Sequence, residues 1–578
     1  MKKKKKHLSK LIRIIACLIF ILAVNIISSF VFDRLDLTSE KRYTLSPTTK
    51  ELLKNIDDYV YFKVALTGSD LPVSFQRLKN ETKEMLDEFA AHSKYIEYVF
   101  IDPAASDDPE EVAAAYQELY DKGLVATDLQ VKKSDGSMRK IIFPGAIATY
   151  KDREIAIQLL QTQMGVPSEE VLNNSIQSLE YSLSNAIRKL VTIHKSEIAI
   201  IEGHGELNKN YMIAFEAMLR EYYSVSYVTI NGQLNSLADI KGKGEDSVKI
   251  VNKYKAIIIP GPKQPFSEKD KFVIDQYIMR GGKVLWLVEP VYASMDSLQN
   301  SPTTMSYAID HNLQDQLFNY GIRIEPQLIM DLQCLSIPLS TGSVGGRPQI
   351  DFFPWYYFPV ITPTGDHPIV KNLNAIKTEF ISPVTPLEIS NVKATVLLTS
   401  SPYSKLFMTP DVISLDILRN KPSPSLFTKS EIPVAVLLEG EFNSLYDGRI
   451  PYEVQNNSLI GFKSESSPTA MVVISDVDII KNQFRSSDGT PLNLGYDQYT
   501  QNQFGNPELM LNIMNYLCDD SKLISVRSRE LKIRLLDSAK IHNNSIKIQI
   551  LNMIIPSVLI IIGGIIYWFI RKRKYSKK

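Results

Sequence analysis

Two long apolar stretches, residues 14–32 and 548–570, lie near the two ends of the chain and contain no charged residue. A helix rises about 1.5 Å per residue, so helices of this length approach the roughly 30 Å hydrocarbon thickness of a bilayer. We therefore expect each stretch to cross a membrane once. The residues between them alternate strand-like and helix-like patterns, and at about 100–200 residues per domain they predict several folded domains.

The first alternation covers residues 56–190. Aromatic and β-branched residues at 59–66 and 96–101 predict two strands, with an amphipathic helix between them. A second helix is expected to begin at Pro109 and to end at Gly123. The pattern therefore starts as strand, helix, strand, helix.

Two shorter strands, 128–132 and 139–143, come next and are separated by a turn signal at 134–136. One long amphipathic helix is then expected from Pro167 to about residue 190. This order is typical of thioredoxin-like domains, but the chain has no C-x-x-C motif. The sequence thus predicts a thioredoxin-like unit that serves as a scaffold or docking module without redox chemistry.

The second alternation has continuous apolar strands at 197–201, 256–259, 283–288 and 470–474, with helices between them. Strands that are apolar on both faces predict a parallel sheet covered by helices on both sides, as in a Rossmann-like domain. Asn506 is expected to cap the helix after the last of these strands. The alternation of strands and helices is interrupted by a proline-rich insertion, in which residues 342–348 are expected to form a mobile loop.

These patterns predict an α/β fold class with segments in a definite order. The segments are a basic tail 1–13, a transmembrane helix 14–32, a juxtamembrane connector 33–55, a thioredoxin-like domain 56–190, a Rossmann-like, glutamine-amidotransferase-like domain 191–535 with an insertion at about 295–462, a connector 536–547, a transmembrane helix 548–570 and a basic tail 571–578.

Both tails are basic and contain no acidic residue, whereas the rest of the chain has 52 basic and 64 acidic residues, a net charge of −12. Basic residues beside a membrane helix are retained on the cytoplasmic side. We therefore expect a two-pass protein of a bacterial inner membrane, with both termini in the cytoplasm and an acidic body in the periplasm. An acidic body argues against a nucleic-acid surface.

Two other readings of the first apolar stretch are less favoured. A cleaved signal peptide would need a small-x-small site, which does not close the stretch before Asp33. A lipid anchor on Cys17 would leave a long apolar run after the modified residue. Of the remaining cysteines, Cys334 and Cys518 could pair in an oxidising compartment, and the sequence does not decide whether they do.

Candidate binding residues follow three of the predicted parallel strands, because ligands of open α/β sheets bind beyond the carboxyl ends of the strands. They could form a polar cleft for a cation, a sugar or a peptide. In the alternative, structural interpretation, Gly203 and Gly205 form a tight turn while His204 and the acids cap the next helix. The candidates are Glu202, His204, Glu206, Glu289, Asp476 and Asp478.

The sequence lacks the usual catalytic motifs. There is no P-loop run, no G-x-S-x-G or G-x-C-x-G elbow and no H-E-x-x-H. The seven histidines are scattered along the sequence and do not indicate a zinc site. We therefore predict no catalytic residues, no metal site and no cofactor, and we do not expect the chain to be an enzyme.

Several motifs, in this order, resemble the GldG family, the gliding-motility-associated auxiliary component of an ABC transporter in Bacteroidota. They are RYTLSP at 42–47, LPVSFQRLKNETKEMLDEFA at 71–90, FIDP at 100–103, IIEGHGE at 200–206, GGKVLWLVEP at 281–290 and RKRK at 571–574. The resemblance implies a separate ABC permease and a separate ABC ATPase as partners, in a system for gliding motility or export. It also implies a glutamine-amidotransferase-like domain without its nucleophile.

The leading hypothesis is therefore a non-enzymatic periplasmic subunit of an ABC system that binds a partner or ligand and is coupled to the permease through its membrane helices. The alternative is a membrane-anchored hydrolase or sugar-binding enzyme that uses the acidic strand ends around His204. A structural spacer between the inner membrane and the cell wall is a third hypothesis. The sequence does not identify the transported substrate or the stoichiometry with the other subunits.

Overall fold

The computed structural model describes residues 44–575, apart from 69–70, 134–135, 242–248, 345–346 and 529–537, together with Phe20 and Ile21. The first predicted membrane helix, 14–32, otherwise lies outside the described residues. The described residues before 529 belong to one compact unit, and those after 537 belong to another. The two units are described separately.

The chain from residue 44 to residue 192 forms a mixed four-stranded sheet in the order β2-β1-β5-β6. Strands β1 and β2 are parallel, whereas β5 is antiparallel to both β1 and β6. Strands β3 and β4 form a separate hairpin, as the turn signal predicts. The strands are β1 (Val60–Val64), β2 (Ile96–Phe100), β3 (Thr127–Lys133), β4 (Gly136–Ile142), β5 (Gly145–Tyr150) and β6 (Arg153–Gln158).

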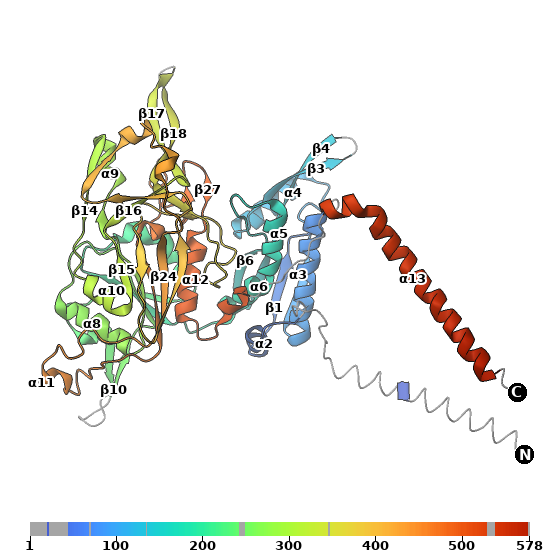
Figure 1. Cartoon of the computed structure of the whole chain (residues 1–578), viewed down its shortest axis with the longest axis horizontal. Helices are drawn as coiled ribbons and strands as arrows, with labels where there is room; N and C mark the ends of the chain where they lie inside the picture. Colours follow the sequence, from blue (N-terminus) through green and yellow to red (C-terminus); the bar gives the residue numbers. More distant parts are fainter. Residues whose placement is uncertain are drawn as a thin grey trace, which may run out of the picture. The chain divides into compact units, whose positions relative to one another are not determined.

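Helices cover both faces of this sheet (Figure 1). Apolar side chains of α2 (Pro47–Lys54), α3 (Val73–His92), α5 (Ser168–Gln177) and α6 (Leu179–Val191) share one core with Val60, Phe62 and Val64 of β1. Helix α4 (Pro109–Asp121) packs with Phe143 and Ile147 in a smaller core.

The single helix expected from Pro167 to residue 190 is interrupted at Ser178, which separates α5 from α6. The Ser178 amide is shared between the carbonyls of Asn174 and Ser175, and its hydroxyl donates to the Asn174 carbonyl at 2.9 Å. A serine hydroxyl that competes for the carbonyl four residues earlier disturbs a helix. The prediction of one continuous helix was therefore wrong.

Residues 195–528 contain a seven-stranded sheet in the order β21-β24-β25-β12-β11-β7-β8. Five of the strands run parallel: β7 (Glu197–Glu202), β8 (Ser224–Thr229), β11 (Ala256–Pro260), β12 (Lys283–Leu287) and β25 (Thr469–Ile474). Strands β21 (Val392–Thr399) and β24 (Pro433–Gly440) complete one edge in the antiparallel direction. Both come from within the predicted insertion, so part of that segment belongs to the sheet itself.

Alternate residues of each parallel strand face opposite sides, which gives the sheet two apolar cores. Ile198, Ile200 and Leu285 pack with α7 (Ile213–Arg220) and α12 (Asn506–Cys518) on one side. On the other side the sheet packs with α8 (Glu268–Met279) and α10 (Gln314–Tyr320). The mixed α/β fold class is therefore confirmed, whereas the thioredoxin-like and Rossmann-like assignments stay predictions.

Two details at the ends of elements differ from the sequence prediction. Helix α12 starts at Asn506 itself, and Gly505 occupies the cap position, because the Asn506 side chain bonds to the backbone of Lys377 instead. Residues expected as a mobile loop are paired in β17 (Cys334–Val344) and β18 (Arg347–Ile361), since Ser343 lies opposite Pro348. These two strands project as a long hairpin (Figure 1).

Smaller elements surround the main sheet. The strands are β9 (Ala238–Lys241), β10 (Lys249–Asn252), β13 (Val291–Tyr292), β14 (Thr303–Ala308), β15 (Ile322–Ile324), β16 (Gln327–Asp331), β19 (Ile376–Lys377), β20 (Val384–Pro386), β22 (Ser404–Met408), β23 (Asp411–Ser414), β26 (Tyr496–Asp497) and β27 (Asn502–Gln503); the helices are α9 (Met295–Asn300), α11 (Tyr452–Gln455) and the 3₁₀ turn η7 (Leu523–Ser528).

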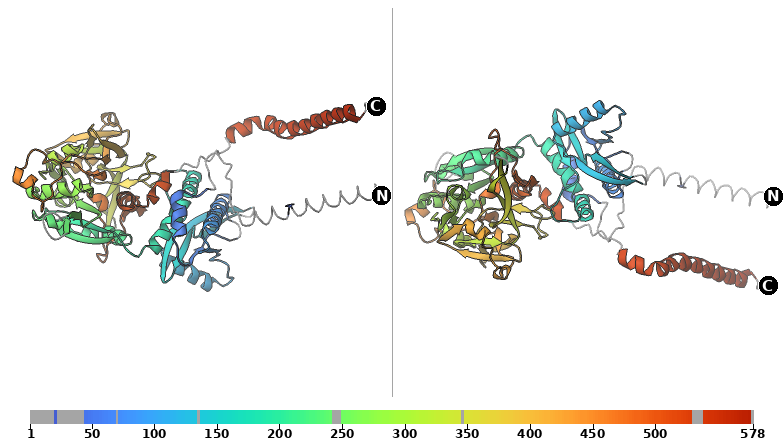
Figure 2. Two further views of the ribbon diagram at one scale, coloured as in Figure 1. Left: turned by 90° about the horizontal axis from the view of Figure 1, so that it is seen from below. Right: turned by 90° about the horizontal axis from the view of Figure 1, so that it is seen from above.

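The second unit contains α13 (Ser538–Tyr575), shown in red in Figure 2. Its span Asn544–Tyr575 is long enough to cross a membrane and contains a strongly apolar stretch, none of which is buried. Asn544 has a non-helical φ of −122° and kinks the helix at the start of this span. Among the described residues this is the one helix with these properties.

Candidate functional site

The six predicted site residues all lie at or just after the ends of parallel strands of the large sheet, but the structure brings only three of them together. Strand β25 lies next to β12, so Asp476 and Asp478 lie close to Glu289. Carboxylate oxygens of these three residues all lie within 4.8 Å of one another. The residues after β7 are not part of this group, because β11 separates β7 from β12.

Backbone N–H groups fix two of the three carboxylates. Asp476 is fully buried and accepts bonds from the amides of Asp478 at 2.7 Å and Glu379 at 2.9 Å. Glu289 accepts from the amide of Val477 at 3.2 Å. The chain around the ends of β12 and β25 therefore orients these two acids, whereas the Asp478 carboxylate pairs with a lysine side chain, that of Lys481.

Burial and mutual repulsion make these acids hard to ionise together. Burial raises the pKa of Glu289 to about 8, and the charge of Asp478 adds to this. The pKa of Asp476 is raised well above its ordinary value for the same two reasons. Burial also raises the pKa of Asp478. Burial therefore favours the protonated form of Glu289 at neutral pH.

Two partly buried lysines partly compensate the acids. Lys481 pairs with Asp478 at 2.8 Å, and Lys377 pairs with Glu379 at 3.1 Å. Burial disfavours the charged form of Lys481, but Asp478 and Glu379 outweigh it and raise its pKa. Burial opposes ionisation of Glu379, but Lys377 and Lys481 lower its pKa overall. The site therefore carries both signs of charge.

A cavity of about 260 Å³, which we call the strand-end cavity, is lined by Glu289, Glu379, Asp478 and Lys481 but not by Asp476 or Lys377. A polar molecule with positive and negative groups could find partners for both there. Oxygen ligands such as these three carboxylates also suit a hard cation, and no zinc-type ligand set is present among them. The lining includes Tyr211, Lys263, Glu289, Tyr292, Asp296, Glu379, Asp478 and Lys481.

His204 lies in a different, closely packed arrangement. Its Nδ1 is 3.3 Å from Glu206 Oε1, its Nε2 is 3.3 Å from Asp270 Oδ2, and its ring stacks on Phe266 at 3.7 Å. Burial opposes protonation of the ring, but the two carboxylates outweigh it and raise the pKa of His204. Both ring nitrogens are thus occupied by the protein itself.

The turn around His204 is tight, as the structural interpretation predicts. Gly203 and Gly205 have positive φ values of 119° and 73°. The His204 carbonyl accepts from the amides of Lys263 and Gln264, and its ring reaches the start of α8 rather than the next helix along the chain. Glu202 forms an exposed ion pair with Lys209 at 2.8 Å.

The sequence prediction missed Lys377 and Glu379. Glu379 lines the strand-end cavity, and Lys377 pairs with it. Lys377 is the last residue of β19 and Glu379 stands two residues later, about one hundred residues before Asp476 and within the predicted insertion. No local pattern marks them as partners of the strand ends. Lys481 did carry a signal, since it stands three residues after Asp478 and pairs with it.

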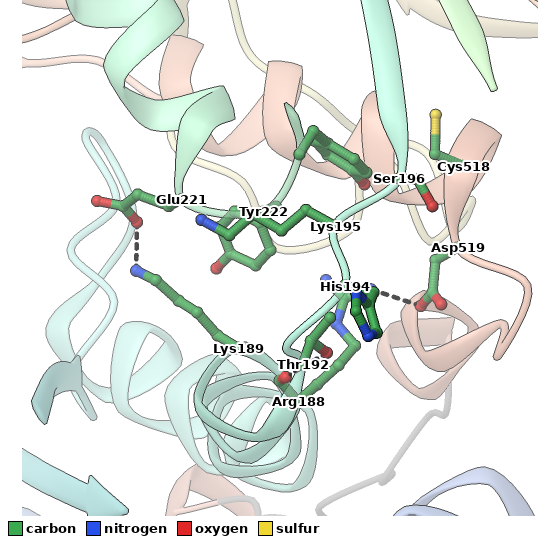
Figure 3. A pocket seen from close by; sticks show the side chains of 11 residues that line it. Arg188, Lys189, Thr192, His194, Lys195, Ser196, Glu221, Tyr222, Cys518 and Asp519 are labelled. Carbon is green, nitrogen blue, oxygen red and sulfur yellow. Dashed lines mark hydrogen bonds and ion pairs between the residues drawn. The ribbon is translucent and has the colours of Figure 1, made fainter. Parts of the chain in front are cut away.

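A second, smaller cavity of about 100 Å³ lies where α6 meets β7 and the end of α12. Figure 3 shows Arg188 and Asp519 on one side of it and Lys189 with Glu221 on the other. Arg188 pairs with Asp519 at 2.7 Å and also donates to Asn515 at 2.9 Å. We call this set of contacts the Arg188 clasp.

A family model described as "ABC-type uncharacterized transport system" matches residues 195–513, more than half of the chain. The chain belongs to this family. The match includes every residue of the strand-end cavity. It confirms the predicted relation to ABC transport systems, whereas the assignment to GldG and to Bacteroidota stays a prediction. Together with the apolar α13, membership in this ABC transport family indicates membrane association.

Other comparisons give less detail. A model described as "Domain of unknown function (DUF7088)" matches residues 39–149. A relative from Borreliella burgdorferi, described as "Uncharacterized protein", is 22% identical over 567 residues, and the alignment covers 96% of each chain. The solved structure "mmIFT52 N-terminal domain" has 12% identity and a TM-score of 0.30 over 56% of this chain and 97% of its own. A TM-score this low supports no conclusion about the fold or function of this chain.

Proposed function

We propose that the chain is a non-enzymatic, membrane-anchored subunit of an ABC transport system, which serves gliding motility or export. Its outer part binds a partner or ligand in the strand-end cavity, and its membrane helices couple it to a separate permease and a separate ATPase. The observation that carries the proposal is the family match on a chain that also has the exposed apolar helix α13.

The proposed topology has two membrane helices, both termini in the cytoplasm and the body in the periplasm. The basic residues that follow α13 support this orientation, since cytoplasmic ends of membrane helices carry excess lysine and arginine. In the periplasm, the thioredoxin-like unit would act as a scaffold and the Rossmann-like unit would hold the ligand. The parallel order of β1 with β2, and of the five central strands, supports these two assignments.

A hydrolase centred on His204 is less favoured. A general base needs a ring nitrogen within reach of a substrate proton. Both nitrogens of His204 face carboxylates of the protein, and the ring is nine-tenths or more buried. The geometry suits a residue that holds a turn against α8.

Co-purification from native membranes tests the proposal. The full chain, tagged at its C-terminus, should retain an ABC ATPase and a polytopic permease in mild detergent, identified by mass spectrometry. The matched control replaces residues 548–570 with an unrelated membrane helix of the same length, which should keep the chain in the membrane but reduce recovery of the permease. Recovery of neither subunit with the natural chain would contradict the proposal.

Topology is tested by labelling single cysteines with an impermeant maleimide in intact spheroplasts. Cysteines placed at Ser576 and at Ser425 should differ, with only the latter labelled before lysis. Ser425 is exposed. Equal labelling of both before lysis would refute the two-pass orientation.

A further inference from the structure

A third cavity, of about 470 Å³, lies between the end of β6 and the start of α12. We call it the amide cavity. Its walls come from the segment that follows β6, from a turn at residues 372–374, and from the segment at and around β27. Its lining is Val125, Thr127, Pro144, Gln158, Leu160, Gln161, Thr162, Met164, Asn372, Leu373, Asn374, Gln501, Asn502, Gln503, Phe504, Glu508 and Arg527.

Neutral hydrogen-bonding side chains dominate this lining, in contrast to the charged strand-end cavity. Some amides serve the fold: Asn374 donates to the Gln503 carbonyl at 2.8 Å. Others have no side-chain hydrogen bond to the described part of the protein, namely those of Gln161, Asn372 and Asn502. Amide groups without protein partners can both donate to and accept from a ligand.

The two charged residues of the amide cavity play different parts. The Arg527 side chain is held by the protein itself, since it donates to the Lys371 carbonyl at 2.6 Å and its guanidinium lies 5.1 Å from the centre of the Tyr181 ring. The Glu508 side chain is exposed to solvent, but dense protein around it raises its pKa, and Arg527 opposes this only partly. Glu508 is therefore the acidic group available to a ligand.

The shape and composition favour a peptide over a sugar. Sugar rings need an accessible flat apolar surface, and aromatic rings usually supply it. The aromatic residue in this lining, Phe504, is 2% exposed and packs in a core. Strand β6 is the outer strand of its sheet in the described structure, and it ends at Gln158 in the cavity wall. An extended segment can pair with such an edge while its side chains enter adjoining pockets.

We propose that the amide cavity binds an extended peptide segment of a partner protein, with a lysine or arginine of that segment paired to Glu508. The unpartnered amides of Gln161, Asn372 and Asn502 bind the peptide backbone. This site is separate from the strand-end cavity and does not depend on the function proposed for it.

An array of random nonapeptides, probed with the full chain in detergent, provides the test. Peptides with a central lysine or arginine should be enriched over those with a central glutamate. For the best binder, measured by fluorescence polarisation, Glu508→Gln should weaken binding at least tenfold and should not affect the same peptide with norleucine at the basic position. Gln161→Ala should weaken both peptides.

The matched control is Glu169→Gln, which removes an exposed glutamate from the first turn of α5 and should leave binding unchanged. Unaltered thermal unfolding of each variant shows that the fold is intact. No enrichment on the array, equal binding by Glu508→Gln and the natural chain, or binding of a panel of oligosaccharides in place of peptides would each overturn the proposal.

Discussion

The Arg188 clasp offers the sharpest test of how residues 44–192 are held to the large sheet. Arg188 pairs with Asp519, donates to Asn185 and Asn515, and lies 5.4 Å from the centre of the Tyr222 ring. The ion pair is partly shielded from water, with 15% of the Arg188 side chain and 10% of the Asp519 side chain exposed. Arg188→Met keeps most of the side-chain stem and removes the charge.

The loss should be large because it leaves the Asp519 carboxylate without its cationic partner, with only the Ser521 amide and hydroxyl donating to it. Removing one member of a buried pair costs about 3–5 kcal/mol. The residual exposure of the two side chains places the expected value near the lower end, about 3 kcal/mol. Lys189, the next residue, pairs with Glu221, of which 50% is exposed. Lys189→Met should therefore cost about 1 kcal/mol or less.

Urea unfolding of the full chain in detergent, followed by tryptophan fluorescence, measures both values. Trp286 is fully buried in the large sheet and reports its unfolding. In the Arg188→Met variant, hydrogen exchange should also accelerate in α6, α12 and η7. Equal effects of the Arg188 and Lys189 substitutions on the free energy of unfolding, or unchanged exchange in η7, would refute this account of the clasp.

Three further outcomes follow from single positions. His204→Gln should destabilise the protein more at pH 5.5 than at pH 8.5 in urea unfolding. The pKa of His204 is raised in the folded state, so its contribution to stability is complete below about pH 6.5 and is lost as the pH rises through the folded-state pKa. A larger destabilisation at pH 8.5 would contradict this prediction. Gly261→Ala should cost about 2–4 kcal/mol in the same assay, since φ is +64° and an added Cβ would lie 2.8 Å from Val477, whereas Gly448→Ala, with φ of +66° and nothing within 4 Å, should cost about 1 kcal/mol. Ile562→Asp should cost about 3 kcal/mol of insertion free energy and raise the fraction of chain extracted from membranes by carbonate, while Ile562→Leu should not.

Sequence patterns predict the structure correctly where residues that are neighbours in the sequence determine the conformation. Ser267 caps α8 by accepting a hydrogen bond from the amide of Asp270, as a serine directly before a helix commonly does. The apolar run 256–259 is a fully buried parallel strand. In both cases a few neighbouring residues fix the conformation, so their pattern carries the information.

Predictions failed where a distant partner decides the structure. The sequence predicts Asn506 as a helix cap, but the Asn506 side chain bonds instead to the backbone of Lys377, in a distant part of the chain. Strand β24 lies inside the predicted insertion and yet pairs with β25, because strand pairing depends on which apolar edge the fold presents. The same limit applies to Glu379, whose backbone amide donates to Asp476, 97 residues later in the chain.

The charges of the strand-end cavity are hard to explain by stability alone. Taking carboxylates and ammonium groups out of water costs several kcal/mol for each ion, and well-packed apolar residues of similar volume often stabilise a fold as much or more. Here Glu289, Asp476 and Asp478 repel one another, and even with Lys481 present the pKa of Glu289 is raised to about 8. A site that keeps a proton for lack of positive charge can exchange that proton for a cationic group of a ligand. We therefore propose that the acids at the ends of β12 and β25 serve to bind a cationic group of a ligand, and do not serve the stability of the sheet.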